Sequence, residues 1–463
     1  MNPEYFRDAF IAIQQLVSEG LVLAGHDISA GGIITCLLEM CFANTKGGLD
    51  INFNKLAEGD IVKILFAENP GVVIQVKDSD ATRVKKILDD AGVGYAKIGN
   101  PTVSEGKRLI TIAKTVSNAN VPNTQLAARD MVFTFDIEEL RDVWYKTSFL
   151  LDRRQSFNGK AAERFANYSN IPVEWSLSGE PLKAESRDNI KGKRPLVAVI
   201  REKGSNSERE MAWSFYQAGF DVKDVTMTDL ITGRETLEEV NVIAFCGGFS
   251  NSDVLGSAKG WAGAFLYNPK AKEALDKFYS RQDTLSFGVC NGCQLMIELG
   301  LIDNNFPLQS ATEDRLSADR LLQYKQQYAQ MQHNDSHKFE STFVTLQIPQ
   351  NNSVMFGSLS GQKIGCWVAH GEGKFHLPQS EDKYNIVAKY NRHGYPANPN
   401  GSDYDVAALA SADGRHLAIM PHPERTQHPW QCGYYPVERR MTDTVTPWHE
   451  AFVNARKWVE ERM

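Results

Sequence analysis

An alternation of short apolar runs and helical patterns from residue 196 onward restricts the fold of this 463-residue chain more than any other feature. The apolar runs suit buried strands, and the segments between them place apolar residues at helical spacing. This succession predicts an α/β fold with a doubly wound, mostly parallel sheet, extended by later strands that are partly antiparallel. The predicted strands are 196–200, 222–227, 242–246, 285–289, 343–348, 364–369, 386–390, 406–409 and 417–420, and the predicted helices are 208–218, 270–279, 293–299 and 448–462.

A sharp turn is expected where the strand that ends at Val289 meets the next helix. Cys290 has Gly288 two residues before it and Gly292 two residues after it. Such glycines permit a strained strand-to-helix turn that lifts the side chain out of the sheet. The helix N-terminus behind Cys290 favours the thiolate over the thiol, whose unperturbed pKa is about 8.5. Cys290 is therefore a candidate nucleophile, and a structural cysteine in a glycine-rich turn is the alternative.

Two distant segments strengthen the catalytic interpretation. The predicted strand 242–246 runs into Gly247 and Gly248, whose backbone N–H groups could bind the oxyanion of a tetrahedral intermediate. Another predicted strand delivers His422 and Glu424, which at this spacing project from the same side of an extended segment. His422 would act as general base and acid, and Glu424 would hold its tautomer. Taken alone, His-Pro-Glu also fits a solvated loop histidine, but three such motifs at strand ends predict one site.

These motifs resemble those of the class I, or triad, glutamine amidotransferases. They read Gly288-Val-Cys-Asn-Gly-Cys-Gln-Leu-Met296, Cys246-Gly-Gly-Phe-Ser250 and Met420-Pro-His-Pro-Glu-Arg425. The flanking motifs are similar to those in the carboxy-terminal part of the large, single-chain phosphoribosylformylglycinamidine synthases. This resemblance extends over essentially the whole chain. The flanking motifs read Asp253-Val-Leu-Gly256, Gly260-Trp-Ala262, Trp367-Val-Ala-His-Gly-Glu-Gly373 and Pro447-Trp-His-Glu-Ala-Phe-Val-Asn-Ala-Arg456.

The resemblance implies a reaction and its substrates. Cys290 would attack the side-chain carboxamide of glutamine, and Gln294 would contact that glutamine. The ammonia released would serve the ATP-dependent conversion of formylglycinamide ribonucleotide to its amidine, which yields ADP, phosphate and glutamate. Glutamine hydrolysis itself needs no cofactor.

Residues 1–116 are predicted to form a compact α/β unit. Helices are expected at 5–18, from 32 through 42 and at 80–91, and strands at 20–25, 71–76 and 95–99. In His26-Asp-Ile-Ser-Ala-Gly-Gly32, Asp27 and Ser29 could hold a hydrated Mg²⁺ and a nucleotide phosphate. An N-cap followed by a turn is the simpler interpretation of these residues.

The same segment resembles the C-terminal half of an aminoimidazole-ribonucleotide-synthetase-like ATP-binding unit. Phe66-Ala-Glu-Asn-Pro-Gly71 is the second motif shared with it. The resemblance implies that Asp27 ligates Mg²⁺ and that Ser29 contacts bound nucleotide. Because such folds form their nucleotide sites between two halves, the chain is expected to be a fragment that lacks the main synthetase site.

Residues 117–194 are predicted to be a linker with helices, and residues 195–463 the glutaminase domain. The segment 117–124 is polar, and 131–167 is helical in pattern. The charge run Asp152-Arg-Arg-Gln-Ser156 predicts a solvated face without chemistry. Gly204-Ser-Asn-Ser-Glu-Arg209 resembles a phosphate-binding start, but in the family it is a loop near the glutamine site.

The composition of the chain argues against several classes of function and location. A net charge of −7 argues against a nucleic-acid partner, and no apolar run approaches the ~20 residues of a membrane span. The first residues lack the layout of a signal peptide, and the seven cysteines lack zinc-site spacing. These features predict a cytoplasmic protein without membrane or nucleic-acid partners.

Two alternatives and two departures from the family pattern remain open. The chain could be a different triad amidotransferase or cysteine hydrolase, or an assembly module whose glutaminase is silent on its own. Asn251-Ser252 stands where relatives commonly carry Tyr-Gly, beside the expected oxyanion donors. Thr342 stands where they commonly carry arginine, which removes one expected charged contact.

Overall fold

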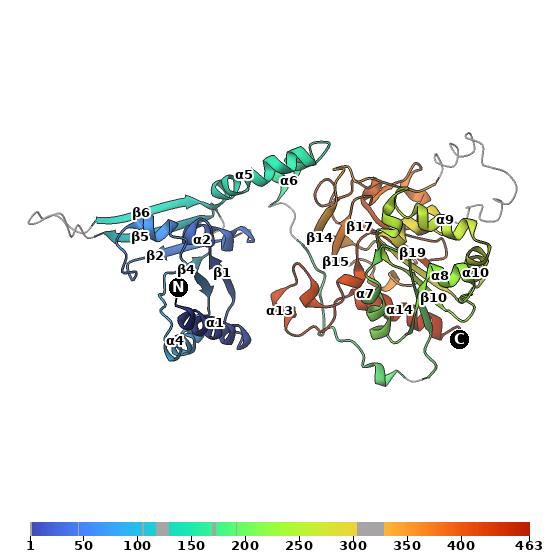
Figure 1. Cartoon of the computed structure of the whole chain (residues 1–463), viewed down its shortest axis with the longest axis horizontal. Helices are drawn as coiled ribbons and strands as arrows, with labels where there is room; N and C mark the ends of the chain where they lie inside the picture. The colour runs from blue at the N-terminus through green and yellow to red at the C-terminus, as the bar shows by residue number, and fades with distance from the viewer. Residues whose placement is uncertain are drawn as a thin grey trace, which may run out of the picture. The chain divides into compact units, whose positions relative to one another are not determined.

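The computed structural model describes residues 2–44, 46–103, 106–116, 129–168, 173–190, 192–302 and 328–463. The chain divides into two compact units, Met1–Leu150 and Leu151–Met463 (Figure 1). The polar segment 117–124 lies outside the described residues, and the proposed boundaries at 116 and 194 stay predictions. No helix among the described residues is both long enough and apolar enough to cross a membrane.

The second unit is built on a nine-stranded sheet in the order β15-β14-β17-β18-β19-β12-β10-β7-β9. Five neighbouring strands are parallel, and in chain order they stand 2-1-3-4-5, which is the flavodoxin-like arrangement. These strands are β7 (Leu196–Arg201), β9 (Asp221–Thr226), β10 (Val242–Phe245), β12 (Leu285–Val289) and β19 (His416–Ile419). The predicted α/β class with a flavodoxin-like sheet is confirmed.

Four further strands extend the sheet beyond β19, and each pairs antiparallel with its neighbours. They are β14 (Glu340–Gln347), β15 (Lys363–His370), β17 (Ile386–Tyr390) and β18 (Val406–Ala410). Two-residue strands β8 (Ser205–Asn206) and β11 (Gly247–Gly248) pair with each other just beyond the ends of β7 and β10. The two glycines are thereby fixed at the carboxyl edge of the sheet.

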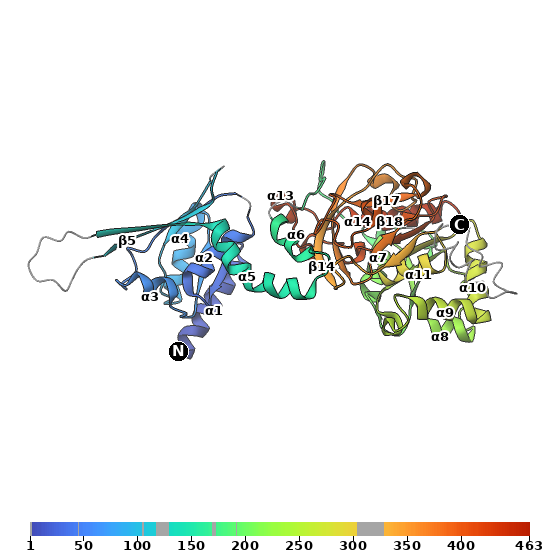
Figure 2. The same cartoon turned by 90° about the horizontal axis from the view of Figure 1, so that it is seen from above.

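Helices cover both faces of the parallel sheet (Figures 1 and 2). On one face α7 (Glu208–Ala218) and α14 (Trp448–Glu460) pack together, and Phe215 and Phe452 meet Phe287 of β12 edge to face. On the other face α8 (Met227–Thr232), α9 (Lys259–Tyr267) and α10 (Pro269–Ser280) lie together. There Phe245 of β10 packs edge to face on Trp261 of α9. These buried aromatic contacts hold the carboxyl ends of β10 and β12 rigidly beside each other.

The first unit combines two sheets with helices. The four-stranded sheet has the order β4-β2-β5-β6, and a two-stranded sheet pairs β1 with β3. The elements are α1 (Pro3–Ser18), β1 (Ala24–Ile28), α2 (Gly32–Phe42), β2 (Gly48–Asn52), α3 (Ile61–Phe66), β3 (Gly71–Gln75), α4 (Ala81–Asp90), β4 (Gly99–Thr102), β5 (Leu109–Val116) and β6 (Arg129–Asp136).

Three sequence predictions need correction here. Residues 131–136 are the strand β6, not helix; only α5 (Ile137–Gln155) and α6 (Lys160–Asn167) are helical. Met131, Phe133 and Phe135 alternate along β6 and pack on the core around Ile112. The strands predicted at 20–25 and 95–99 form about four residues later, as β1 and β4. Residues Leu21 and Val22 instead pack on the cluster between α1 and α4.

Candidate active site

Cys290 occupies the turn between β12 and the helix α11 (Asn291–Glu298), with backbone φ 53° and ψ −108°. This is a strained conformation for a residue with a side chain. Glycine is required on both sides. A Cβ at Gly288 would lie 2.6 Å from Gly292 O, and one at Gly292 would lie 2.2 Å from Phe245 O. The Cys290 N–H donates to Ile419 O over 2.9 Å, so the turn is tied to β19.

Gly247 and Gly248 lie against this turn, and Gly247 touches two predicted site residues at once. A Cβ at position 247 would lie 3.0 Å from His422 Cε1 and 3.3 Å from Cys290 Cβ. Gly248 has φ +113°, and a Cβ there would lie 2.5 Å from Asn206 N. The structure therefore brings Cys290, His422 and the paired glycines together at the end of the sheet.

His422 follows β19 and pairs with β15, since its N–H donates to Trp367 O over 2.8 Å. Its Nδ1 lies 2.6 Å from Glu424 Oε1, and both side chains are 1% exposed or less. His422 Nε2 is buried and has no hydrogen-bond partner in the structure. The imidazole is thus oriented by Glu424 on one side and leaves its other nitrogen free for chemistry.

The charges of the three side chains are strongly coupled. Burial raises the pKa of the Cys290 thiol, but the nearby imidazoles of His370 and His422 and their positive charge outweigh it and lower that pKa to about 5. Burial lowers the pKa of His422, but the Glu424 carboxylate and the Cys290 thiolate raise it to about 9. Burial would raise the pKa of Glu424, and the His422 charge holds it below its usual value. At neutral pH the site therefore holds a thiolate beside an imidazolium.

Cys293, three residues after Cys290, has a pKa shift in the opposite direction. It is fully buried, and burial raises the pKa of its thiol well above the ordinary value. It is therefore an inert packing residue in α11.

The loop after β7 also reaches the site. Ser207 Oγ donates to Glu424 Oε1 over 2.9 Å, and Arg425 Nη2 donates to Ser207 Oγ over 3.1 Å. Ser207 belongs to the glycine-containing segment 204–209 that the sequence singled out as a loop near the site. Its individual contact with Glu424 was not predicted, because no local pattern marks it.

His370, the last residue of β15, is a site residue to which the sequence assigned no role. Its imidazole is buried beside Cys290, whose Sγ also lies 3.7 Å from Ala369 O. Its Nε2 hydrogen-bonds Asn400 Oδ1 over 2.8 Å, whereas Nδ1 is buried without a partner. Its presence in the family-like segment Trp367 to Gly373 was the only available signal.

Gln294 is buried in α11 and already engaged. Its Nε2 donates to Glu372 O over 2.7 Å, and its Oε1 accepts from Asn291 Nδ2 over 2.9 Å. Asn291 Oδ1 in turn accepts from Ser250 N. A direct contact of Gln294 with substrate glutamine therefore stays a prediction.

In the first unit, Asp27 and Ser29 are both exposed, near the end of β1. The two family-like motifs of this unit meet, because Gly31 N donates to Glu68 Oε1 over 2.9 Å. A Cβ at Gly32 would lie 2.5 Å from Leu65 O, so the approach requires glycine. Within the described residues no group of three or more His, Cys, Asp or Glu side chains could hold a metal ion.

The two departures from the family pattern have distinct settings. Asn251, Ser252 and Asp253 follow the paired glycines and all have left-handed φ values, of 52°, 55° and 50°. Thr342 lies in β14 opposite Val368 and lines a pocket that Arg164 and Lys338 also line.

Comparison with known proteins finds two matching families. Residues 194–459 match the family described as CobB/CobQ-like glutamine amidotransferase domain. Residues 1–112 match the family described as AIR synthase related protein, C-terminal domain.

Whole-chain relatives are similar over nearly all of this chain. A phosphoribosylformylglycinamidine synthase of Homo sapiens is 37% identical over 99% of this chain and 34% of its own length. That of Saccharomyces cerevisiae is 32% identical over 98% of this chain and 33% of its own length. The chain thus spans about a third of the length of these relatives. Among solved structures, PurLQS from Thermotoga maritima has a TM-score of 0.41 and 21% identity, and covers 58% of this chain and 99% of that one.

Proposed function

The chain belongs to the family of CobB/CobQ-like glutamine amidotransferase domains, and on that premise we propose that it hydrolyses glutamine with Cys290 as nucleophile. His422 acts as acid and base, and Glu424 orients His422. The observation that supports this proposal is the position of Gly247 at the end of the parallel sheet, where an added Cβ would lie against both Cys290 and His422.

In the first step the Cys290 thiolate attacks the side-chain carboxamide carbon of glutamine. The negative charge that develops on the carbonyl oxygen needs hydrogen-bond donors aimed at it. Phe249 N donates to Gly204 O, so in the antiparallel β8–β11 pair the Gly248 amide faces away from the ladder. The Gly248 amide is therefore better placed than that of Gly247, and the Asn291 N–H at the start of α11 is the second donor.

His422 then moves the protons of the reaction. The imidazolium gives its proton to the departing nitrogen, and ammonia leaves as the γ-glutamyl thioester forms on Cys290. The neutral imidazole next takes a proton from water, which attacks the thioester and releases glutamate and the thiolate. Glu424, bonded at His422 Nδ1, keeps Nε2 as the nitrogen that exchanges protons.

We further infer that the ammonia serves the reaction named in the relatives, phosphoribosylformylglycinamidine synthesis. In that reaction the substrates are glutamine, formylglycinamide ribonucleotide and ATP. Similarity over the whole chain, across both units, supports this assignment over a different triad amidotransferase or a cysteine hydrolase.

Asp27 and Ser29 form one side of the nucleotide site in this proposal. Asp27 would hold Mg²⁺ and Ser29 would contact nucleotide, and the exposure of both side chains suits a site completed by further polypeptide. Mg²⁺ would neutralise phosphate charge there. The seven free cysteines fit the cytoplasmic location that we propose.

Glutamate release by the purified chain, with the Cys290→Ala and Cys293→Ala variants in parallel, tests the glutaminase assignment. We expect Cys290→Ala to abolish hydrolysis and Cys293→Ala to keep most of it. Equal loss in both variants would contradict Cys290 as the nucleophile. If the wild-type chain released no glutamate, and a full-length relative in which this chain replaces its matching part made no amidine from glutamine, formylglycinamide ribonucleotide and ATP, the silent assembly module would be the better interpretation.

A further inference from the structure

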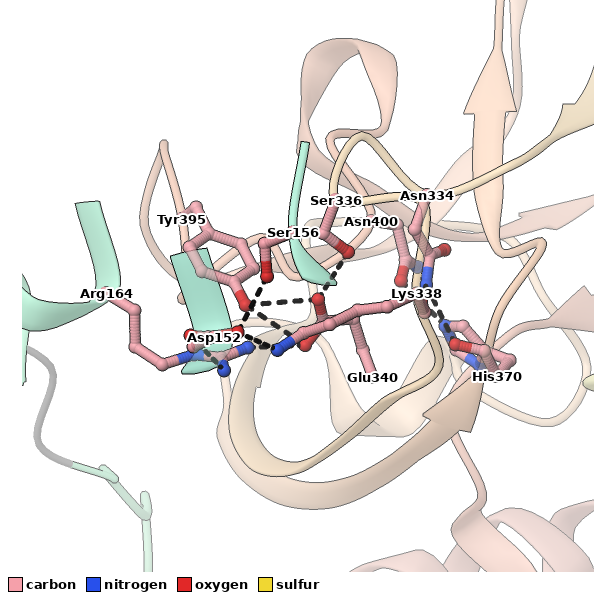
Figure 3. A network of polar contacts seen from close by, with 10 residues as sticks. All are labelled: Asp152, Ser156, Arg164, Asn334, Ser336, Lys338, Glu340, His370, Tyr395 and Asn400. Atoms are coloured by element: carbon pink, nitrogen blue, oxygen red, sulfur yellow. Dashed lines mark hydrogen bonds and ion pairs between the residues drawn. The ribbon is translucent and has the colours of Figure 1, made fainter. Parts of the chain in front are cut away.

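Asp152 is buried, although its charge run predicts a solvated face. Its carboxylate accepts hydrogen bonds from Lys338 Nζ, from Arg164 Nη1 over 3.1 Å and from Ser156 Oγ over 2.7 Å (Figure 3). Burial raises the pKa of Asp152, but these donors outweigh it and hold that pKa below its usual value. The prediction holds for Arg153, Arg154 and Gln155, which are exposed, and fails at Asp152 because two of its three partners lie far from it in sequence or on another helix.

Arg164 joins Asp152 to a second buried carboxylate. Its Nη2 donates over 2.7 Å to Glu340, which is 2% exposed and also accepts from Tyr395 OH over 3.0 Å and from Ser336 Oγ. Two anions and two cations therefore balance inside this cluster. Because removal of one partner of a buried ion pair leaves an uncompensated charge, each member is expected to matter.

The segment 152–164, called the clamp below, grips the turn 334–340 through its backbone as well. Phe157 N donates to Ser336 O over 2.9 Å, and Asn158 Nδ2 donates to Asp335 O over 3.0 Å. The ion pairs hold Lys338 and Glu340 at the other end of the same turn. The clamp therefore fixes the turn at both ends.

Asn334 links the turn 334–340 to His370 through hydrogen bonds. Its Nδ2 donates to His370 O over 2.8 Å and to Lys338 O over 3.1 Å, and its Oδ1 accepts from Gly373 N over 2.9 Å. Figure 3 shows the continuous path from Arg164 to His370. Glu340 also stands directly opposite His370 in the β14–β15 pair. The backbone of His370 is thus held by the turn that the clamp fixes.

The ring of His370 has a defined proton arrangement. Asn400 Nδ2 donates to Gly373 O over 2.9 Å and to Tyr390 OH over 2.7 Å, so Asn400 Oδ1 is the group that faces His370 Nε2. His370 Nε2 therefore carries a hydrogen. Its Nδ1 is buried without a partner and can stabilise the Cys290 thiolate only when it also carries a hydrogen, so the ring acts on the thiolate as an imidazolium.

We propose that the clamp is a positioning element of the glutaminase site, which acts through the turn 334–340 and Asn334 to hold the His370 imidazole against the Cys290 thiolate. The inference rests on the proposed function only in taking Cys290 as the reacting thiol. The residues of the clamp do not touch substrate; they set the geometry of a group that touches the nucleophile.

The test measures alkylation of Cys290 by iodoacetamide from pH 4 to pH 10, followed by peptide mass spectrometry with Cys290→Ala as blank. This readout does not depend on glutamine turnover. Lys338→Met removes one cation of the cluster, Lys338→Arg keeps it, and His370→Gln removes the imidazole. Glu235→Gln breaks the ion pair between the buried Glu235 carboxylate and the exposed Lys223, outside the clamp and the turn, and serves as control.

We expect Lys338→Met to weaken ionisation of the thiol about ten-fold, so that alkylation at pH 5 slows about five-fold. Lys338→Arg and Glu235→Gln should keep the wild-type profile. His370→Gln should shift the profile as Lys338→Met does, and the double variant should shift it no further, because the clamp acts through His370.

The possible failures are distinguishable. A wild-type thiol with an ordinary pH profile would count against the proposed function, and against the clamp with it. A low-pH profile that Lys338→Met leaves unchanged, with circular dichroism showing a folded chain, would overturn the clamp alone. Additive shifts in the double variant would overturn the route through His370.

Discussion

Ser207 Oγ donates a hydrogen bond to Glu424 Oε1, the same oxygen that lies 2.6 Å from His422 Nδ1. All three side chains are buried, and Glu424 Oε2 has no hydrogen-bond partner in the structure. Two donors thus converge on one carboxylate oxygen, and the loop after β7 takes part in orienting the imidazole.

The Ser207→Ala variant removes one of these two donors. We expect glutamine hydrolysis to slow about ten-fold and the free energy of unfolding to fall by about 1–2 kcal/mol, because a buried carboxylate loses a hydrogen bond. Steady-state kinetics and urea denaturation measure the two effects. Ser214→Ala removes a buried bond to Glu210 O within α7 and should reduce stability without slowing turnover. Equal slowing in both variants would contradict a role for Ser207 at the site.

The pH dependence of glutamine hydrolysis should be bell-shaped, with limbs near 5 and 9. The pKa of Cys290 is lowered to about 5, so the nucleophile is lost as the pH falls through this value. The pKa of His422 is raised to about 9, so the acid that protonates the departing nitrogen is lost as the pH rises through that value. Because the two groups titrate as a coupled pair, the apparent pKa values read from the two limbs belong to the pair and not to either residue alone.

A variant separates the two limbs. His422→Gln removes a positive charge from beside the thiolate, so the lower limb of Cys290 alkylation should move to higher pH. An unchanged lower limb in this variant would show that the two groups do not interact.

The local sequence pattern was sufficient to predict those helices and strands whose own residues determine their structure. Helix α7 and strand β12 form with the predicted bounds, because apolar spacing and flanking glycines specify both without distant partners. The prediction for residues 131–136 was wrong because Met131, Phe133 and Phe135 alternate only briefly before the amphipathic helix α5. The pattern of that helix masked the strand. Pairing with β5, which decides the outcome, is not a local signal.

The site residues also divide into those that local sequence could predict and those that depend on distant parts of the chain. Cys290, His422 and the paired glycines stand at strand ends, where the edge of a parallel sheet gathers them, so their proximity could be anticipated. His370 and Ser207 are placed by register and by loop conformation. His370 lies in β15, which β14, β17, β18 and β19 separate from β12 in the sheet, so its approach to Cys290 depends on that chain of pairings. No spacing in the sequence encodes that order.

Gly247→Ala should impair the site while leaving the fold largely intact. The added Cβ would lie 3.0 Å from His422 Cε1 and 3.3 Å from Cys290 Cβ, so the imidazole and the thiol must give way by a few tenths of an ångström. A displacement of this size is expected to slow glutamine hydrolysis about ten-fold. The measurement is kcat, together with the thermal midpoint.

Gly357→Ala is the matched control for this substitution. A Cβ added at Gly357 would have Asn351 O as its nearest neighbour, at 3.7 Å, which is an ordinary van der Waals distance. Turnover should stay unchanged. A loss of turnover at Gly357 as large as that at Gly247 would mean that alanine acts through general destabilisation rather than through crowding of the site.

Ser252→Gly should stabilise the chain. Ser252 has φ +55° in a run of three non-glycine residues with left-handed φ. The left-handed conformation costs about 1–2 kcal/mol for a residue with a Cβ, and glycine's larger unfolded-state entropy offsets about half of the gain. The free energy of unfolding in urea should therefore rise by up to about 1 kcal/mol. Ser380, with φ −64°, has no such strain, so Ser380→Gly should lower stability. A loss of similar size at both positions would contradict strain at Ser252 and would mean that contacts of its side chain stabilise the loop beside the paired glycines.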